Sequence, residues 1–397
     1  MGIKKILFLC LKLKKMKNNF EFKNPTQIIF GKGTIAQLAQ KLPKTEKILV
    51  TYGGGSVKQN GVYEQVCRAL QGFEYVEFWG IEPNPTVETL RKAIALGEQE
   101  KITYILAVGG GSVIDGTKLI SSAIPYDGDA WELVLRPSKI GKMVPFASVL
   151  TLSATGSEMN CGAVISNTEK QEKFAFYSSH PQFSILDPTI TFTLPEFQIA
   201  CGIADTFIHV LEQYLTEAGE SPLMDRWSES IMQTLIELAP KIKADKTDYD
   251  TMSEFMICAT MALNGFTAMG VTEDWATHLI GHEITALHGV THGQTLAIVV
   301  LGTMKVMREQ KRAKLLQFGD RVFNICEGTE NQRIDKTIEA CEHFFRSIGL
   351  ATKLHELNIG IETILSIKER FLQRGTRLGE CGNIDGYVTE QILKECL

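Results

Sequence analysis

Two apolar segments of the chain each run directly into the same five residues, Gly-Gly-Gly-Ser-Val. The first segment is Lys47–Tyr52 and the second is residues 104–108. Short apolar runs that end at glycines are typical of strands buried on both faces, and a helical pattern follows each of these turns. Strands that alternate with helices at this spacing form a parallel sheet with helices on both faces. The sequence therefore predicts a doubly wound α/β domain.

The same patterns place further elements along the chain. Strands are expected at residues 27–30, 75–78, 145–152 and 183–186, and helices at residues 34–42, 63–70, 87–100 and from residue 113. After Pro195 the strand signals fade and long helical periodicities dominate to the end. A chain of 397 residues, 44% of them hydrophobic, is long enough for two cores. We therefore predict a second, helical domain, with a boundary near residue 200 and no linker.

The first fifteen residues, MGIKKILFLCLKLKK, are basic around an apolar run of six residues. This run is too short to span a membrane, and no small-residue cleavage site follows it. We expect residues 1–15 to be a disordered upstream extension from a misassigned start codon, with Met16 as a more ordinary start. A membrane-associated role for this segment is the alternative.

Composition excludes several classes of partner. The formal net charge is −5 and the body of the chain carries no basic block, so we expect no nucleic acid as a partner. The nine cysteines are scattered and form no Cys-x-x-Cys pair. Reduced thiols in a cytoplasmic protein are the simplest interpretation.

The two glycine turns predict a nucleotide site. Glycines between a strand and a helix let backbone N–H groups approach a phosphate, and the helix N-terminus adds positive charge. Neither turn has the common dinucleotide-binding pattern GxGxxG. For each turn, the alternative is a tight connection between strand and helix that binds no ligand. Residues 53–57 contain no acid that could hold a free adenine ribose. This favours NADP(H) over NAD(H), with Ser56 and Lys58 near a 2′-phosphate.

Two features beyond the turns fit a ligand site. Asp115 lies one turn into the second helix, where its carboxylate can accept from a ribose hydroxyl or from local amides. Residues 151–160, TLSATGSEMN, are small and rich in hydroxyls, and they follow a predicted strand. We expect this segment to lie against the ligand, with a plain polar loop as the alternative.

Histidines are concentrated in one stretch of the second half. Four of the chain's eight lie within fifteen residues, at His278, His282, His288 and His292, and a separate pair upstream consists of Asp205 and His209. A spacing of four puts both members of a pair on one helical face. A histidine on an apolar helical face usually belongs to the core or the surface, but this density favours a metal site. Three imidazoles and a carboxylate suit Fe²⁺ or Zn²⁺, which acts as a Lewis acid on a carbonyl oxygen.

Together these motifs resemble a known family. GGGSVID at residues 109–115, ATGSE at 154–158, and D-x-x-x-H with H-x-x-x-H-x9-H resemble the iron-containing (group III) alcohol dehydrogenases. IEPNP, TYGGGSVKQNG, TLSATGSEMN and DWATHLIGHEITA are similar to the branch of NADPH-dependent butanol dehydrogenases and broad-range aldehyde reductases. The resemblance covers nearly everything from Met16 onward. Ser153, in place of a proline, and Ile190, in place of an aromatic residue, depart from the pattern.

The resemblance implies a fold and a site. It implies a Rossmann-like dinucleotide-binding domain at residues 16–200, an all-helical metal-binding domain at residues 201–397 as in dehydroquinate synthase, and a homodimer. The implied metal ligands are Asp205, His209, His278 and His292. His282 is implied to lie by the nicotinamide, although it shares a helical face with His278 and the two are open to exchange. The residues expected at the cofactor are Gly53, Gly54, Ser56, Gly110, Gly111, Ser112, Asp115, Thr151, Thr155, Asn160 and Lys173. His288 is expected to be a bystander.

The function predicted from the sequence is that of a metal-dependent, NADPH-linked alcohol dehydrogenase or aldehyde reductase. It would transfer hydride between NADP(H) and short-chain aldehydes or primary alcohols, such as butanal and butanol. One alternative is an NAD-dependent polyol dehydrogenase of the same superfamily. Another is a non-catalytic nucleotide- or metal-binding protein.

Overall fold

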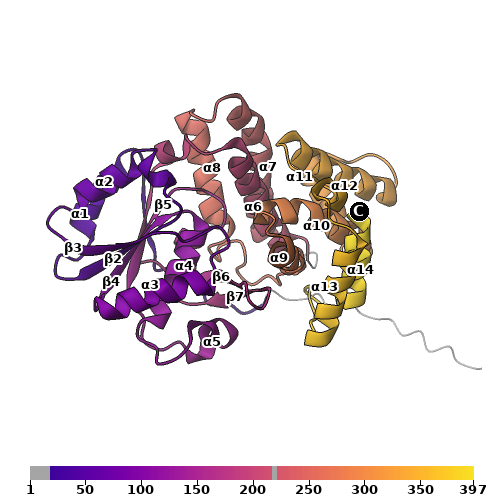
Figure 1. Ribbon diagram of the computed structural model, residues 1–397. Coiled ribbons are helices and arrows are strands. Elements are labelled where there is room, and N and C mark those ends of the chain that lie inside the picture. The colour runs from indigo at the N-terminus through magenta and orange to yellow at the C-terminus, as the bar shows by residue number, and fades with distance from the viewer. Residues whose placement is uncertain (1–17, 217–220) are drawn as a thin grey trace, which may run out of the picture.

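The computed structural model describes residues 18–216 and 221–397 (Figure 1). The predicted upstream extension, residues 1–15, lies outside the described residues. The chain first forms a sheet flanked by helices and then continues as helices alone, which confirms the predicted fold class. Among the described residues, no helix combines the length and the apolar character needed to cross a bilayer.

The sheet has six parallel strands in the order β1-β8-β5-β4-β2-β3. The strands are β1 (Gln27–Phe30), β2 (Lys47–Tyr52), β3 (Glu74–Phe78), β4 (Tyr104–Gly109), β5 (Phe146–Leu150) and β8 (Phe183–Leu186). The chain leaves β2 toward one edge and leaves β4 toward the other. The carboxyl ends of these two neighbouring strands therefore form the switch point at which such sheets bind ligands. Both glycine turns lie there.

Successive side chains of the central strands enter opposite cores. On β2, Leu49 belongs to one apolar cluster, whereas Ile48 and Val50 belong to the other. The first face is covered by α3 (Val87–Gln99), α4 (Gly111–Ala123) and α5 (Ala130–Leu135), and the second by α1 (Leu38–Lys41) and α2 (Val62–Ala69). Burial on both faces explains why these strands are continuous apolar runs.

Several elements differ from the sequence prediction. The helix expected at residues 34–42 is a 3-10 turn, Thr34–Gln37, that continues into α1, and α4 begins two residues earlier than expected. Helix α5 was not predicted, and neither was an antiparallel hairpin of β6 (Gly162–Asn167) and β7 (Glu172–Tyr177) outside the main sheet.

The helical part begins with α6 (Glu196–Tyr214), which is buried from Ile199 to its end. It continues with α7 (Pro222–Ala244), α8 (Tyr249–Ala262), α9 (Ala276–His288), α10 (His292–Val306), α11 (Arg312–Phe323), α12 (Glu330–Ser347), α13 (Ile361–Arg374) and α14 (Gly386–Glu395). In Figure 1, α6, α9 and α10 form the centre of this part. Gly293 lets α10 begin against α6, because a Cβ at Gly293 would lie 2.2 Å from the carbonyl oxygen of Cys201.

Candidate metal centre and active site

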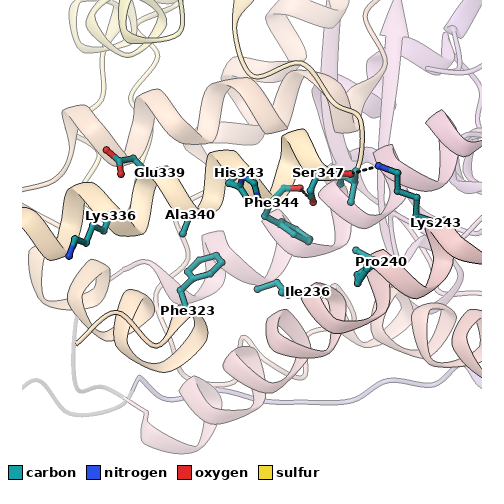
Figure 2. Close-up of a pocket in the computed structure, with 12 residues that line it drawn as sticks. Ile236, Pro240, Lys243, Phe323, Lys336, Glu339, Ala340, His343, Phe344 and Ser347 are labelled. Atoms are coloured by element: carbon teal, nitrogen blue, oxygen red, sulfur yellow. Dashed lines mark hydrogen bonds between the residues drawn. The ribbon is translucent and has the colours of Figure 1, made fainter. Parts of the chain in front are cut away.

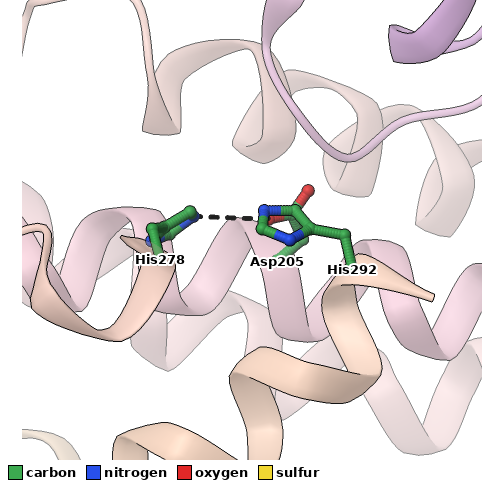
Figure 3. A group of neighbouring side chains, drawn as sticks. All are labelled: Asp205, His278 and His292. Carbon is green, nitrogen blue, oxygen red and sulfur yellow. Dashed lines mark ion pairs between the residues drawn. The ribbon is translucent and has the colours of Figure 1, made fainter. Parts of the chain in front are cut away.

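The carboxylate of Asp205 is the point on which the predicted ligands converge. Its Oδ1 lies 3.5 Å from His209 Nδ1, 3.7 Å from His278 Nε2 and 3.8 Å from His292 Nε2. Figure 3 shows the side chains of His278 and His292 directed toward Asp205. Ligands that bind one ion tetrahedrally at about 2.1 Å lie about 3.4 Å from one another. The spacing is therefore that of groups that share a metal ion, and it is too long for good hydrogen bonds.

Several atoms of this centre are buried without a hydrogen-bond partner in the described part of the chain. They include Asp205 Oδ1, His209 Nδ1 and His278 Nε2. Buried polar atoms are normally paired, because leaving one unpaired costs free energy. Asp205, His278 and His292 each offer a ligand atom within 4.8 Å of the others. His209 completes the predicted set from the adjacent turn of α6, with its ring stacked on His278 at 4.5 Å between centroids.

Glu212, which was not among the predicted site residues, supports this centre. Its Oε1 accepts from the backbone N–H of Thr277 at 2.6 Å, and its Oε2 contacts His278 Nδ1. A carboxylate on Nδ1 fixes the imidazole so that Nε2 is free for a metal. The spacing of Asp205, His209 and Glu212 along α6, four residues and then three, was the available signal, because it places all three on one helical face.

The charges of the centre shift the pKa values of its groups. Burial lowers the pKa of His209 to about 4, although Asp205 opposes this, so its imidazole is neutral as metal binding requires. Burial raises the pKa of Asp205, but the imidazoles of His209 and His278 outweigh it and hold the value below normal. Burial also lowers the pKa of His278, yet the charges of Glu212 and Asp205 raise it overall to about 9. A metal ion held by Nε2 would replace that proton.

His282 lies beside the centre, with its ring 5.0 Å from that of His292 between centroids. Both of its ring nitrogens are buried without a hydrogen-bond partner among the described residues. Burial, followed by the charge of Lys173, holds the pKa of His282 well below its usual value, so the ring is neutral. A neutral imidazole with two open nitrogens can relay a proton.

The sheet part reaches the metal centre in two places. Lys173, on β7, is buried and donates to Asn84 Oδ1 at 2.8 Å. After burial, its positive charge is the next cause that lowers the pKa values of His282 and His292. The hydroxyl of Thr206, the neighbour of Asp205, donates to the carbonyl oxygen of Ala154 at 3.3 Å. The loop at residues 151–160 thus packs directly on the helix that carries Asp205.

The glycines of the two turns have different surroundings. A Cβ at Gly54 would meet no atom within 4 Å, whereas one at Gly111 would lie 2.4 Å from Thr155 Oγ1. Gly54 therefore leaves open space for a ligand. Gly111 is needed for close packing of the loop at residues 151–160 on α4.

Two of the residues expected at the cofactor make several bonds within the protein. Asp115 Oδ1 accepts from the hydroxyl of Ser157 at 2.5 Å, and its Oδ2 accepts from the backbone N–H of Val164 at 2.9 Å. Asn160 Nδ2 donates to the carbonyl oxygens of Gly156 and Leu263. Asp115 was expected either to accept from a ribose hydroxyl or to accept from local amides. These contacts favour the second role.

Two other features lie apart from the centre. His288 is exposed, and its Nε2 is 2.8 Å from the hydroxyl of Thr363. A surface groove with a volume of about 720 Å³ lies between α7 and α12, over side chains such as Ile236 and Phe344 (Figure 2). None of the residues that line this groove is a predicted site residue.

The structure thus places a nucleotide-binding type of sheet beside a buried Asp–His centre, an arrangement suited to an enzyme that uses both a nucleotide and a metal ion. The chain matches the family model "Iron-containing alcohol dehydrogenase" over residues 25–188 and the model "Fe-containing alcohol dehydrogenase family, C-terminal" over residues 199–393. It belongs to the iron-containing alcohol dehydrogenase family, as the motifs predicted.

Individual relatives match over nearly their whole length. The chain is 46% identical over 381 residues to the NADPH-dependent aldehyde reductase YqhD of Escherichia coli, which covers 94% of this chain and 98% of that protein. It is 39% identical over 386 residues to the probable NADH-dependent butanol dehydrogenase 1 of Bacillus subtilis, covering 96% of this chain and 100% of that one. The crystal structure of E. coli YqhD superimposes with a TM-score of 0.95 at 45% identity, covering 97% of this chain and 100% of that structure.

Proposed function

We propose that this protein is a metal- and NADPH-dependent alcohol dehydrogenase that mainly reduces short-chain aldehydes, such as butanal, to primary alcohols. The observation that carries the proposal is the convergence of three imidazoles on Asp205 next to a loop that also packs on the second glycine turn. The similarity to an aldehyde reductase and a butanol dehydrogenase supports the substrate class.

The proposed metal ligands are Asp205, His209, His278 and His292, with iron or zinc as the ion. A divalent ion held there supplies a Lewis acid for the carbonyl oxygen of the aldehyde. Glu212 orients His278, and the burial of the centre keeps bulk water away from the reacting carbonyl carbon. His282, neutral and with both nitrogens open, is proposed to relay the proton that the alcohol oxygen takes up.

The proposed cofactor is NADP(H), held by the turn glycines, Thr151, Thr155 and Lys173. The first turn offers no carboxylate to a free adenine ribose, whereas Ser56 and Lys58 can receive a 2′-phosphate. Lys58 Nζ lies 3.9 Å from the ring centroid of Trp79, which holds its ammonium near this turn. Because the relatives include both NADPH- and NADH-dependent proteins, use of NAD is the alternative that an experiment must separate.

We further propose a homodimer in the cytoplasm. Strand β1 forms one edge of the sheet, and Phe30 on it and Phe22 before it are 37% and 41% exposed. Sheet edges with apolar side chains are surfaces that association covers. Seven described cysteines, at positions 67, 161, 201, 258, 326, 341 and 396, are free thiols, as expected in a reducing compartment.

The test is an aldehyde panel with NADPH and with NADH, on anaerobically purified protein loaded with Fe²⁺ or Zn²⁺. We expect aldehyde-dependent oxidation of NADPH that requires the metal and is slower with NADH. If the metal-loaded protein binds NADPH but none of the aldehydes in the panel causes NADPH oxidation, the result would support the non-catalytic alternative and refute the proposal.

A further inference from the structure

Lys311, directly before α11, is buried and joins three parts of the helical region. The exposed fraction of this residue is 2%. Its Nζ donates to the carbonyl oxygen of Leu215 at 2.6 Å, to Asp274 Oδ2 at 2.6 Å and to Glu380 Oε2 at 2.8 Å. These acceptors follow the last residue of α6, precede α9 and lie between α13 and α14. An ammonium has three protons, so all of its donors are satisfied.

Asp274 carries this anchor to α9. Its Oδ1 accepts from the backbone N–H of Ala276, the first residue of α9, at 2.7 Å. The residue between them, Trp275, has a positive φ of 62°, a conformation that a non-glycine residue adopts only when its surroundings hold it there. The start of α9 therefore depends on Asp274, and His278 follows one helical turn later.

Glu212 joins the same group of residues from α6. Its side chain meets α9 at the backbone N–H of Thr277 and at His278 Nδ1, and its carbonyl oxygen accepts from the backbone N–H of Asp274 at 3.0 Å. Glu212, Asp274, Thr277 and Lys311 line one small internal cavity of about 10 Å³. A continuous set of buried contacts thus connects Lys311 with a predicted metal ligand.

Lys311 brings a positive charge to the carboxylates of Asp274 and Glu380. Its pKa is raised, because Asp274 and Glu380 outweigh the effect of burial, so the ammonium stays charged. Burial and the neighbouring Glu380 raise the pKa of Asp274 to about 7. Without the ammonium, two buried carboxylates would face each other without a counter-ion, which is strongly unfavourable.

We propose that Lys311 is a positioning residue for the metal centre. It holds the end of α6 and the start of α9 in the arrangement in which Glu212 directs Nε2 of His278 at the ion. Lys311 itself touches neither the ion nor the substrate. The proposal rests on the metal centre of the proposed function, and it is tested by metal binding rather than by turnover.

The chain provides a matched control on the next turn. Lys314, on α11, is also buried, at 3% exposure, and its Nζ pairs with Asp225 Oδ1 of α7 at 2.5 Å and lies over the ring of Tyr214. Among the described residues, neither Lys314 nor Asp225 has a side-chain hydrogen bond or ion pair with α9. Lys311→Met and Lys314→Met each remove one buried ammonium and keep the aliphatic length, so both should lower the unfolding temperature.

The experiment measures Co²⁺ and Zn²⁺ affinity of the full-length variants by chelator competition, and the visible absorption of the Co²⁺ form. We expect Lys311→Met to weaken metal binding about 10- to 100-fold and to change the Co²⁺ bands, as loss of a ligand-orienting partner does. Lys314→Met should stay within about 2-fold of the wild type, and Lys311→Arg should recover part of the affinity. Equal weakening in both methionine variants, or wild-type affinity and bands in Lys311→Met, would overturn the proposal.

Two further arms keep the outcome decisive. If Lys311→Met does not fold, Glu380→Gln takes its place, because it removes one negative charge beside Lys311 and leaves the bond to Asp274. This variant should bind the metal ions several-fold more weakly than the wild type. An unchanged affinity refutes the proposal. A wild-type protein that binds neither ion refutes the proposed metal centre itself. If the wild type binds the metal ions and Lys311→Met binds them with the same affinity, only the role of Lys311 is refuted.

Discussion

Lys118 in the sheet part and Lys311 in the helical part are both buried, and each amine donates three hydrogen bonds. Lys118 donates only to neutral acceptors, which are Ser157 Oγ at 2.8 Å, Asn160 Oδ1 at 2.9 Å and the carbonyl oxygen of Gly162 at 2.6 Å. Lys311 has two carboxylates among its three acceptors. Each lysine therefore anchors the site of its own part, Lys118 the loop at residues 151–160 and Lys311 the helices of the metal centre.

The pKa values of the two lysines are shifted in opposite directions. Burial lowers the pKa of Lys118 to about 8, and the charge of Asp115 opposes this only in part. The pKa of Lys311 is raised, because its two carboxylates outweigh burial. Neutral acceptors can satisfy the hydrogen bonds of a buried ammonium, but only nearby negative charges raise its pKa enough to outweigh burial.

A second contrast concerns what each site is made of. The proposed metal centre consists of side chains on three helices, whereas the proposed nucleotide turns consist of glycines, which have no side chain. Deleting a side chain should therefore do most damage in the helical part, and adding one should do most damage in the sheet part.

The largest effect is expected from His278→Ala. Because His278 is a proposed metal ligand, its loss should remove the bound metal and lower kcat/KM at least about 1000-fold, which corresponds to about 4 kcal/mol of transition-state stabilisation. His288→Ala, in the same helix but exposed, is the control and should leave both unchanged. Metal analysis and steady-state kinetics check this. If His282→Ala lost the metal while His278→Ala kept it, the two histidines would have to exchange roles.

A smaller effect is expected from Gly54→Asp in the first glycine turn. The added side chain has open space, and its carboxylate would repel a 2′-phosphate but accept from a free ribose hydroxyl. We expect the ratio of kcat/KM for NADPH over NADH to fall about 100-fold, or about 2.7 kcal/mol. Gly54→Asn is the uncharged control. An unchanged ratio in Gly54→Asp would place the 2′-position elsewhere.

Gly111→Ala tests the packing role of the second turn. The new Cβ would lie 2.4 Å from Oγ1 and 3.1 Å from Cβ of Thr155, so rotation of the threonine alone cannot relieve the contact. Overpacking of this kind costs about 1 to 3 kcal/mol of unfolding free energy. Gly54→Ala, in open space, should change it by less than about 0.5 kcal/mol. Urea unfolding compares the two, and equal stability would contradict the close packing of the loop on α4.

The sequence was sufficient for the elements whose pattern is local. The bounds of β2 and β8 were predicted residue for residue, since strands buried on both faces are continuous apolar runs. The β6–β7 hairpin was missed, because β6 is buried on one face only and its small and polar residues give a weak alternating signal. The pair Asp205 and His209 could be placed on one helical face from spacing alone.

The supporting layer of the metal centre could not be predicted in the same way. Lys311 lies 96 residues from Leu215 in the chain, and no periodicity connects them. A buried lysine in a helical pattern is indistinguishable in sequence from an exposed one. Its role becomes visible only when the ends of α6 and α9 are brought together by the fold.

The smallest effect is a difference in pH dependence between the two lysines. The folded-state pKa of Lys118, about 8, is below the ordinary value of 10.5, so between these pH values the unfolded chain binds more protons and stability rises with pH. The advantage of the wild type over Lys118→Met should therefore grow by about 1 kcal/mol between pH 8 and pH 9. For Lys311, whose pKa is raised, the contribution is complete below the ordinary value and is lost only above it. Lys311 itself should thus contribute no pH dependence over the same window. Urea unfolding at pH 8 and pH 9 measures the effect of Lys118, and a gap to Lys118→Met that does not change would contradict a folded-state pKa of about 8.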